Sequence, residues 1–271
     1  MGEYFLRIAL VGHGKMGAAL MSQWAAVADR QFPDHRFDVV DPAAEPGGGP
    51  LPHVTFLNAP PTDATLYDLV IVAVKPQLLD QVLPAYAGLL AEQGFVASIA
   101  AGASIARLKA LSGDAPVVRI MPNLPAAVGA GVSGLCADLS VTPAQREQVE
   151  ALMAAVGTAI WVDDEDQLDR LTAVAGSGPG YVFEIARSYV EAARALGFDA
   201  DTARALVLGT LSGTIAMAQQ SGDDLGELRA SVTSKNGTTA AGLDALNGDG
   251  ALDALMRSTL DAAYARAVEL R

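Results

Sequence analysis

Hydroxyl side chains and a glycine precede an apolar helical pattern in residues 231–243, SVTSKNGTTAAGL. A helix that begins at Gly237, Thr238 and Thr239 would present unpaired backbone N–H groups and the positive end of its dipole to a carboxylate or a phosphate. The threonine hydroxyls would add further hydrogen-bond donors. An ordinary helix start capped by Ser or Thr is the alternative interpretation of the Thr-Thr pair taken alone. The chain has two other glycine-rich segments, and their presence favours an anion-binding site over an ordinary helix start.

The first of these segments is GHGKMG at residues 12–17, which follows an apolar run typical of a buried strand at residues 6–11. In dinucleotide-binding proteins the first glycine permits the turn and the second lets the pyrophosphate approach the backbone. The third glycine lets helix and strand pack closely. The position between a strand and a helix favours this interpretation over a tight turn without a ligand. The second segment, AVAGSGPGY at residues 173–181, opens a helical region and could face a substrate or simply allow close helix packing.

Asp41 ends the second expected strand, downstream of the glycine-rich hexapeptide. An acidic side chain at this place can bond both ribose hydroxyls of NAD and would repel the 2′-phosphate of NADP. This favours NAD. The alternative is that Asp41 initiates a turn, because Pro42 follows it.

Three further segments are expected where strands end, namely AVKP at residues 73–76, IAA at 99–101 and RIMPNLP at 119–125. Ligands collect at the carboxyl ends of strands in an open α/β sheet, so we expect Lys75 near a cofactor ribose or phosphate and residues 99–101 beneath a nicotinamide. Lys75 could equally be an exposed lysine that precedes a proline at the start of a helix. A purely structural turn is an open alternative for residues 119–125.

These segments need a parallel sheet to bring them together. Strand patterns at residues 6–11, 37–40, 69–74, 95–99, 117–121 and 158–162 alternate with helical patterns. They predict a Rossmann-type α/β dinucleotide-binding domain over residues 1–164, with helices on both faces of a parallel sheet. Residues 42–52, which include three consecutive glycines, are expected to form a surface loop without regular structure.

Alanine-rich helical patterns fill residues 165–271 and predict an all-α domain. A small helical domain with this much apolar surface is expected to share helices with a second subunit, so we expect a dimerisation role.

The composition narrows the class of function. The chain has 271 residues, 51% hydrophobic content, and a formal net charge of -13 from 18 Lys+Arg and 31 Asp+Glu, which argues against nucleic acid or an anionic membrane as a partner. No apolar run is long enough to span a bilayer and no targeting leader is evident. The lone Cys136 excludes an intrachain disulfide and a thiolate metal cluster, so we expect no metal and a reducing, cytoplasmic environment.

The absence of strong bases narrows the reaction. All three histidines, His13, His35 and His53, lie in the first 53 residues, and no lysine occurs between Lys109 and Lys235. The expected helical domain therefore lacks the imidazole of hydroxy-acid dehydrogenases and the helix lysine of β-hydroxyacid dehydrogenases. A dinucleotide enzyme of this kind fits an electrophilic small-molecule substrate such as a protonated imine.

The chain resembles the pyrroline-5-carboxylate reductases, the last enzymes of proline synthesis. The resemblance is carried, in the family's order, by GHGKMG, AVKPQ, RIMPNLP, AVAGSGPGY and LRASVTSKNGTTAAGL. It implies an N-terminal Rossmann domain, an all-helical C-terminal domain that interlocks with its twin in a homodimer, and often a ring of dimers. It also implies hydride transfer from NADH or NADPH to the C=N carbon of 1-pyrroline-5-carboxylate.

The resemblance extends to individual positions. Thr239 matches the family's threonine that faces the imine nitrogen, as a proton donor or by orienting water. The predicted substrate-binding residues are Glu165, Ser231, Ser234, Gly237, Thr238 and Thr239. The predicted cofactor-binding residues are Gly12, His13, Gly14, Lys15, Met16, Gly17, Asp41, Asn58, Ala73, Val74, Lys75, Pro76, Ile99, Ala100 and Ala101.

The chain departs from the family pattern in two places. Lys235-Asn236 stands where the family usually has Pro-Gly, which is expected to loosen the loop and leaves Lys235 either to steer the anionic substrate or to point to solvent. Asp41 stands where many relatives have Ser or Arg, so the choice between NADH and NADPH stays open. The alternatives to this function are another imine or β-hydroxyacid reductase of the same plan and a non-enzymatic NAD(P)H sensor.

Overall fold

The computed structural model describes residues 6–48 and 53–271. The chain divides into two compact units, which we call the sheet unit (Met1–Ser177 with Ala263–Arg271) and the helical unit (Gly178–Ala262). The sheet unit therefore extends beyond the domain boundary predicted after residue 164. It does so because α5 packs on the sheet through the buried Leu168, whose side chain lies against Gly134.

Within the described residues, the sheet has nine strands in the order β3-β4-β2-β1-β5-β6-β7-β8-β9. They are β1 (Arg7–Val11), β2 (Arg36–Val40), β3 (Gly47–Gly48), β4 (Val54–Leu57), β5 (Tyr67–Val72), β6 (Leu90–Ser98), β7 (Val117–Met121), β8 (Gly131–Ala137) and β9 (Gly157–Trp161). All neighbouring strands run parallel except β3 against β4 and β7 against β8. The sheet is thus mainly parallel, as expected, with two antiparallel pairs. The loop expected at residues 42–52 contains the short β3. Residues 49–52 of that loop lie outside the described residues.

The helices follow the alternation that the sequence predicts. They are α1 (Lys15–Gln31), α2 (Leu79–Val82), α3 (Ile105–Leu111), α4 (Pro143–Ala154), α5 (Glu165–Leu171), α6 (Gly178–Ala195), α7 (Ala200–Ser221), α8 (Leu225–Ser231), α9 (Thr238–Asn247) and α10 (Ala251–Leu270). Short 3₁₀ turns lie at Pro76–Leu78, Leu83–Leu89 and Leu124–Val128, and a π-helical turn lies at Thr172–Gly176.

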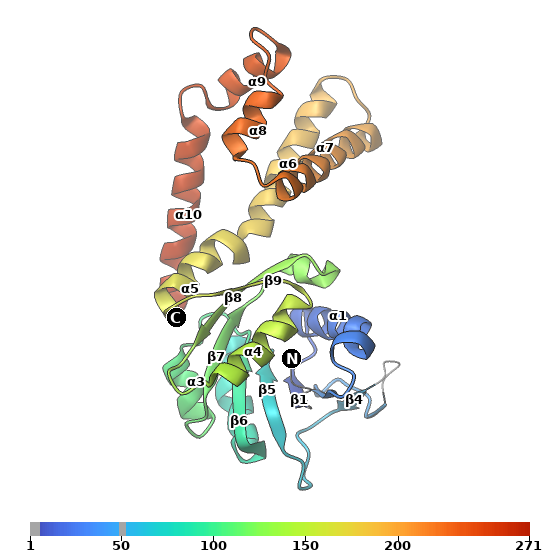
Figure 1. The fold of residues 1–271 in the computed structure, drawn as a ribbon, viewed down its shortest axis with the longest axis vertical. Coiled ribbons are helices and arrows are strands. Elements are labelled where there is room, and N and C mark those ends of the chain that lie inside the picture. The colour runs from blue at the N-terminus through green and yellow to red at the C-terminus, as the bar shows by residue number, and fades with distance from the viewer. Residues whose placement is uncertain (1–5, 49–52) are drawn as a thin grey trace. The chain divides into compact units, whose positions relative to one another are not determined.

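Alternate residues of each central strand enter two separate apolar cores, one on each face of the sheet. Ile8 and Leu10 of β1 pack with Trp24 of α1 and with α4 on one face. Ala9 and Val11 pack on the other face with residues of α2 and α3. Figure 1 shows α1 and α4 lying together over one side of the sheet. The period-two alternation of a strand thus fixes which element covers which face.

Strand order creates a crevice at the carboxyl ends of the strands. From β1 the chain passes to β2 on one side, and later strands are added on the other side, beginning with β5. This reversal of direction is the topological switch point where open α/β sheets bind ligands. The segments after β1 and β5 meet there.

Within the helical unit, all of which is described, the buried apolar side chains are small: Ala186, Ala193, Ala203 and Val207. Large apolar side chains such as Phe183, Ile215 and Met217 are 61%, 57% and 63% exposed. No helix among the described residues is both long enough and apolar enough to cross a membrane.

Candidate functional site

The glycine-rich turn after β1 fits a dinucleotide by its backbone geometry. Gly12 has φ +101°, and a Cβ placed on it would lie 2.9 Å from the carbonyl carbon of Ala73, which follows β5. Its N–H donates to the Val40 carbonyl at 2.8 Å, so the turn is tied to the end of β2 as well. Gly17 lies directly against the Gly12 carbonyl, whereas Gly14 faces open space. Side chains at residues 12 and 17 would break this packing, and the open side at Gly14 leaves room for a pyrophosphate.

Asp41 lies beside this turn and its carboxylate bonds two backbone N–H groups. Oδ2 accepts from His13 at 2.7 Å and Oδ1 accepts from Ala43 at 2.9 Å. These hydrogen bonds, that from His13 above all, hold the pKa of Asp41 below its ordinary value. Asp41 therefore initiates a turn, as Pro42 suggested, and also keeps a negative charge beside the glycine-rich turn. That charge disfavours a 2′-phosphate.

The other predicted cofactor residues follow the strands nearest the switch point. Asn58 is exposed directly after β4, which runs parallel to β2. Lys75 is exposed and Pro76 begins a 3₁₀ turn after β5. Residues 99–101 follow β6, with Ala100 buried and Ala101 exposed. The structure therefore brings the predicted cofactor residues to one edge of the sheet.

The described starts of α1 and α9 differ from those of five other helices. Side chains cap the starts of α3, α4, α5, α7 and α8, through Ser104, Thr142, Asp164, Asp199 and Asp224. By contrast, α1 and α9 begin on Gly14 and Gly237, and neither of these described starts has a side-chain cap. The first backbone N–H groups of both helices are thus available to an anion. They are the two helix starts at which the sequence predicts a pyrophosphate site and a carboxylate site.

The turn that leads into α9 is closed despite its unusual sequence. The N–H of Gly237 donates to the carbonyl of Ser234 at 3.0 Å, and Asn236 has φ +62°. A turn of this kind takes glycine most readily at its third position, and asparagine is the next best residue there. Asn236 therefore keeps the backbone shape for which Pro-Gly would be the ordinary sequence. Lys235 is exposed.

Glu165, a predicted substrate residue, is the first residue of α5 and bonds two other elements. Its Oε1 accepts from the N–H of Ile105 at 2.9 Å and from Nη1 of Arg119 at 2.5 Å. Arg119 lies on β7 with its side chain 7% exposed. We did not single out Arg119 from the sequence, although a charged residue inside the apolar run VVRIM signals a buried ion pair.

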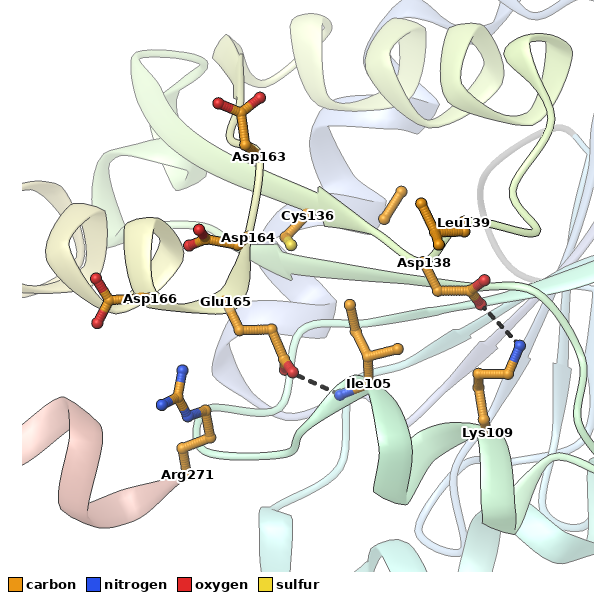
Figure 2. A pocket seen from close by; sticks show the side chains of 11 residues that line it. Ile105, Lys109, Cys136, Asp138, Leu139, Asp163, Asp164, Glu165, Asp166 and Arg271 are labelled. Atoms are coloured by element: carbon orange, nitrogen blue, oxygen red, sulfur yellow. Dashed lines mark hydrogen bonds and ion pairs between the residues drawn. The ribbon is translucent and has the colours of Figure 1, made fainter.

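A hollow of about 680 Å³ lies beside Glu165 in the sheet unit (Figure 2). Its lining residues are Ile105, Lys109, Cys136, Ala137, Asp138, Leu139, Asp163, Asp164, Glu165, Asp166 and Arg271. Burial raises the pKa of the Cys136 thiol to about 11, so it stays protonated at neutral pH and is a poor nucleophile. Among the residues that the structure describes, no group of three or more His, Cys, Asp or Glu side chains is placed to hold a metal ion.

The predicted site residues are thus divided between the units. The cofactor set and Glu165 belong to the sheet unit, whereas Ser231, Ser234 and residues 237–239 belong to the helical unit.

Comparison with known proteins gives consistent matches over nearly the whole chain. A family model described as pyrroline-5-carboxylate reductase dimerisation matches residues 165–270. The pyrroline-5-carboxylate reductase of Pseudomonas aeruginosa is 41% identical over 270 residues, which cover 97% of this chain and 96% of the relative. A solved pyrroline-5-carboxylate reductase from Coxiella burnetii is 32% identical with a TM-score of 0.86, and the match covers 97% of both chains.

A more distant structure agrees in fold. Pyrroline carboxylate reductase from Plasmodium falciparum, solved with NADP bound, has a TM-score of 0.82 at 24% identity over 98% of both chains. The glycine-rich turn at the switch point, the uncapped start of α9 and the extent of these matches agree, and the chain belongs to the pyrroline-5-carboxylate reductase family.

Proposed function

We propose that this protein reduces 1-pyrroline-5-carboxylate to L-proline with NADH or NADPH. Membership of the family over nearly the whole chain carries the proposal, and the uncapped start of α9 agrees with it. When bound, NADH or NADPH would supply the hydride that the C=N carbon needs, and one proton from solvent or a side chain would go to the ring nitrogen.

The sheet unit binds the cofactor in this proposal. The residues that hold it are Gly12, His13, Gly14, Lys15, Met16, Gly17, Asp41, Asn58, Ala73, Val74, Lys75, Pro76, Ile99, Ala100 and Ala101. The ionised Asp41 beside the turn favours NADH over NADPH, because it repels a 2′-phosphate.

The substrate carboxylate is held by backbone N–H groups at the start of α9 and not by an arginine. The substrate residues are Glu165, Ser231, Ser234, Gly237, Thr238 and Thr239. Thr239 is the second residue of α9 and presents its hydroxyl to the imine nitrogen, as a donor or by orienting water. A cyclic imine is electrophilic enough to need no acid stronger than this hydroxyl or a water, which agrees with the absence of histidine from the helical unit.

The chain acts as a homodimer, in line with the dimerisation model that matches residues 165–270. We further propose that the functional domains are residues 1–164 and 165–271, that dimers assemble into a ring, and that the enzyme works in the cytoplasm. The single cysteine, buried and free, suits a reducing compartment.

The proposal is tested by supplying racemic 1-pyrroline-5-carboxylate with NADH or NADPH and following both cofactor oxidation and proline formation. We expect proline to form in step with cofactor oxidation. A cyclic imine without a carboxylate should be turned over poorly, because nothing would engage the α9 amides. Binding of NADH and NADPH without proline formation would contradict the proposal and indicate a sensor.

A further inference from the structure

The loop between β6 and α3, residues 99–104, is held from outside by α5. Oε1 of Glu165 accepts from the N–H of Ile105, the first residue of α3, at 2.9 Å. The first backbone N–H groups of a helix have no acceptor within the helix. Glu165 therefore supplies the acceptor that the Ile105 N–H would otherwise lack. The same oxygen accepts from Nη1 of Arg119 on β7 at 2.5 Å. One carboxylate oxygen thus ties the start of α3 to β7 and α5.

The charge of Arg119 makes this arrangement stiff. Its side chain is 7% exposed, and a buried cation without a counter-ion is strongly unfavourable. The hydrogen bond between the two ions is also stronger than one between neutral groups. Arg119 therefore holds the Glu165 carboxylate in one place, and the position of the Ile105 N–H follows from it.

The loop has several other restraints. The N–H of Ile99 donates to the Val72 carbonyl at 3.0 Å, and the side chains of Ala100 and Ala103 are buried in the core. At its start, the N–H of Ala100 donates to Ser98 Oγ at 3.2 Å. In its middle, Gly102 has φ +73° and lies against the Leu270 carbonyl at the end of α10. At its end, the backbone meets the Glu165 carboxylate. The loop contains only small side chains after Ile99, so these contacts decide where its backbone lies.

We infer that Arg119 and Glu165 form a clamp that positions the β6–α3 loop for the nicotinamide end of the cofactor. The inference rests on the proposed function in one respect, the placing of residues 99–101 against the cofactor. Arg119 and Glu165 are positioning residues in this account, because they act on the cofactor through the loop. In this account the second carboxylate oxygen of Glu165, Oε2, remains available for the substrate.

Asp138 offers a matched control. Its Oδ2 accepts from the N–H of Val117 at 2.9 Å and from Nζ of Lys109 at 3.3 Å, so it too joins a backbone amide and a cation. It acts at the C-terminal end of α3, away from the β6–α3 loop. Both carboxylates stabilise the same helix, but only Glu165 sits where the loop ends.

The test measures the dissociation constants of NADH and NADPH by cofactor fluorescence, without substrate, for Glu165→Ala, Glu165→Asp and Asp138→Ala. Glu165→Asp keeps the charge opposite Arg119 but is one methylene too short to reach both donors, so it covers the case in which Glu165→Ala fails to fold. We expect both Glu165 variants to bind cofactor at least fivefold more weakly. The cofactor dissociation constants of Asp138→Ala should stay within twofold of the wild-type values, even if its unfolding temperature falls as much as that of the Glu165 variants.

Two results would overturn the clamp. One is unchanged cofactor binding in the Glu165 variants with a raised KM for 1-pyrroline-5-carboxylate, which would assign Glu165 to the substrate alone. The other is an equal loss of cofactor binding in Asp138→Ala, which would indicate a general effect on stability. Failure of the proposed reaction would be seen separately, as no proline formed by the wild-type protein while it still binds cofactor.

Discussion

Asp41 shows how one side chain serves both structure and selectivity. Its carboxylate closes a turn through Ala43 and caps the glycine-rich turn through His13, and both bonds stabilise the ionised form. The negative charge therefore persists throughout the neutral pH range. In the proposed binding of the cofactor it lies where NADP carries its extra phosphate, so we expect the cofactor preference to depend on it.

Replacing Asp41 by Ser should shift the preference toward NADPH. We expect the ratio of kcat/KM for NADPH to that for NADH to rise about tenfold, which corresponds to about 1.4 kcal/mol of differential transition-state stabilisation. Glu45→Ser is the control, because it removes an exposed charge from the same region without touching the turn. An equal change in Glu45→Ser would show that net charge, and not the position of Asp41, sets the preference.

Thr239 is proposed to act at the imine nitrogen, either as the proton donor or by orienting water. Removal of its hydroxyl in Thr239→Ala should lower kcat about 100-fold, the lower range for a positioned acid or base. Cofactor affinity should stay unchanged, because the hydroxyl acts at the imine and not at the dinucleotide. Thr239→Ser keeps the hydroxyl and should retain most of the activity. Full turnover by Thr239→Ala would assign the proton to solvent.

At the scale of elements, the turn at residues 234–237 depends on one backbone conformation. Asn236 adopts φ +62°, and a non-glycine residue without a short polar side chain costs about 1–2 kcal/mol in the left-handed region. The turn fixes Gly237, the N-cap of α9, so its shape determines where the free N–H groups point.

Asn236→Ala should lower the free energy of unfolding by about 1 kcal/mol, whereas Asn236→Gly should leave it unchanged or raise it by a few tenths. Chemical denaturation at one fixed protein concentration measures both. Lys235→Ala is the matched control, because this exposed neighbour does not have a positive φ. If the Lys235 variant also keeps the KM for substrate and its salt dependence, Lys235 does not steer the substrate. Equal stability of Asn236→Ala and Asn236→Gly would contradict the backbone argument.

The sequence predicted most elements whose signal is local. The apolar run before residue 12 and the glycine spacing indicated β1, the turn and α1 without reference to any other part of the chain. The strands β3, β4 and β8 were missed. Val54–Leu57 is short, and β8 contains Gly131 and Gly134, which weaken a strand pattern. Their stability comes from neighbours across the sheet, which one sequence does not reveal.

The candidate site likewise has features that local sequence predicts and features that it does not. The dinucleotide turn could be predicted because glycine spacing is itself the signal. The pairing of Arg119 with Glu165 joins residues 46 apart in sequence, and no spacing rule connects them. The roles of the residues at the start of α9 came from family resemblance and remain predictions, although the missing side-chain cap is a physical reason to expect an anion there.

At the scale of the whole molecule, the helical unit lacks a sufficient core of its own. Its buried apolar side chains are three alanines and Val207, while Phe183, Ile215 and Met217 are more than half exposed. Hydrophobic burial is the main favourable term in folding, and a unit with so little of it is marginal alone. We therefore expect a second subunit to cover these faces in the homodimer, and the stability of the protein to depend on its concentration.

Ile215→Glu places a charge on this apolar surface of α7 and should favour the monomer. Burial of an unpaired carboxylate at a subunit interface is strongly unfavourable, so we expect dissociation at micromolar concentration, measured by light scattering after gel filtration, together with a lower unfolding temperature. Gln219→Glu adds the same charge to an exposed polar position of the same helix and should leave the dimer intact. A dimer that withstands Ile215→Glu as well as Gln219→Glu would mean that this face of α7 is free in the assembly. The surface that joins the subunits would then have to be sought among the exposed apolar residues of the other helices.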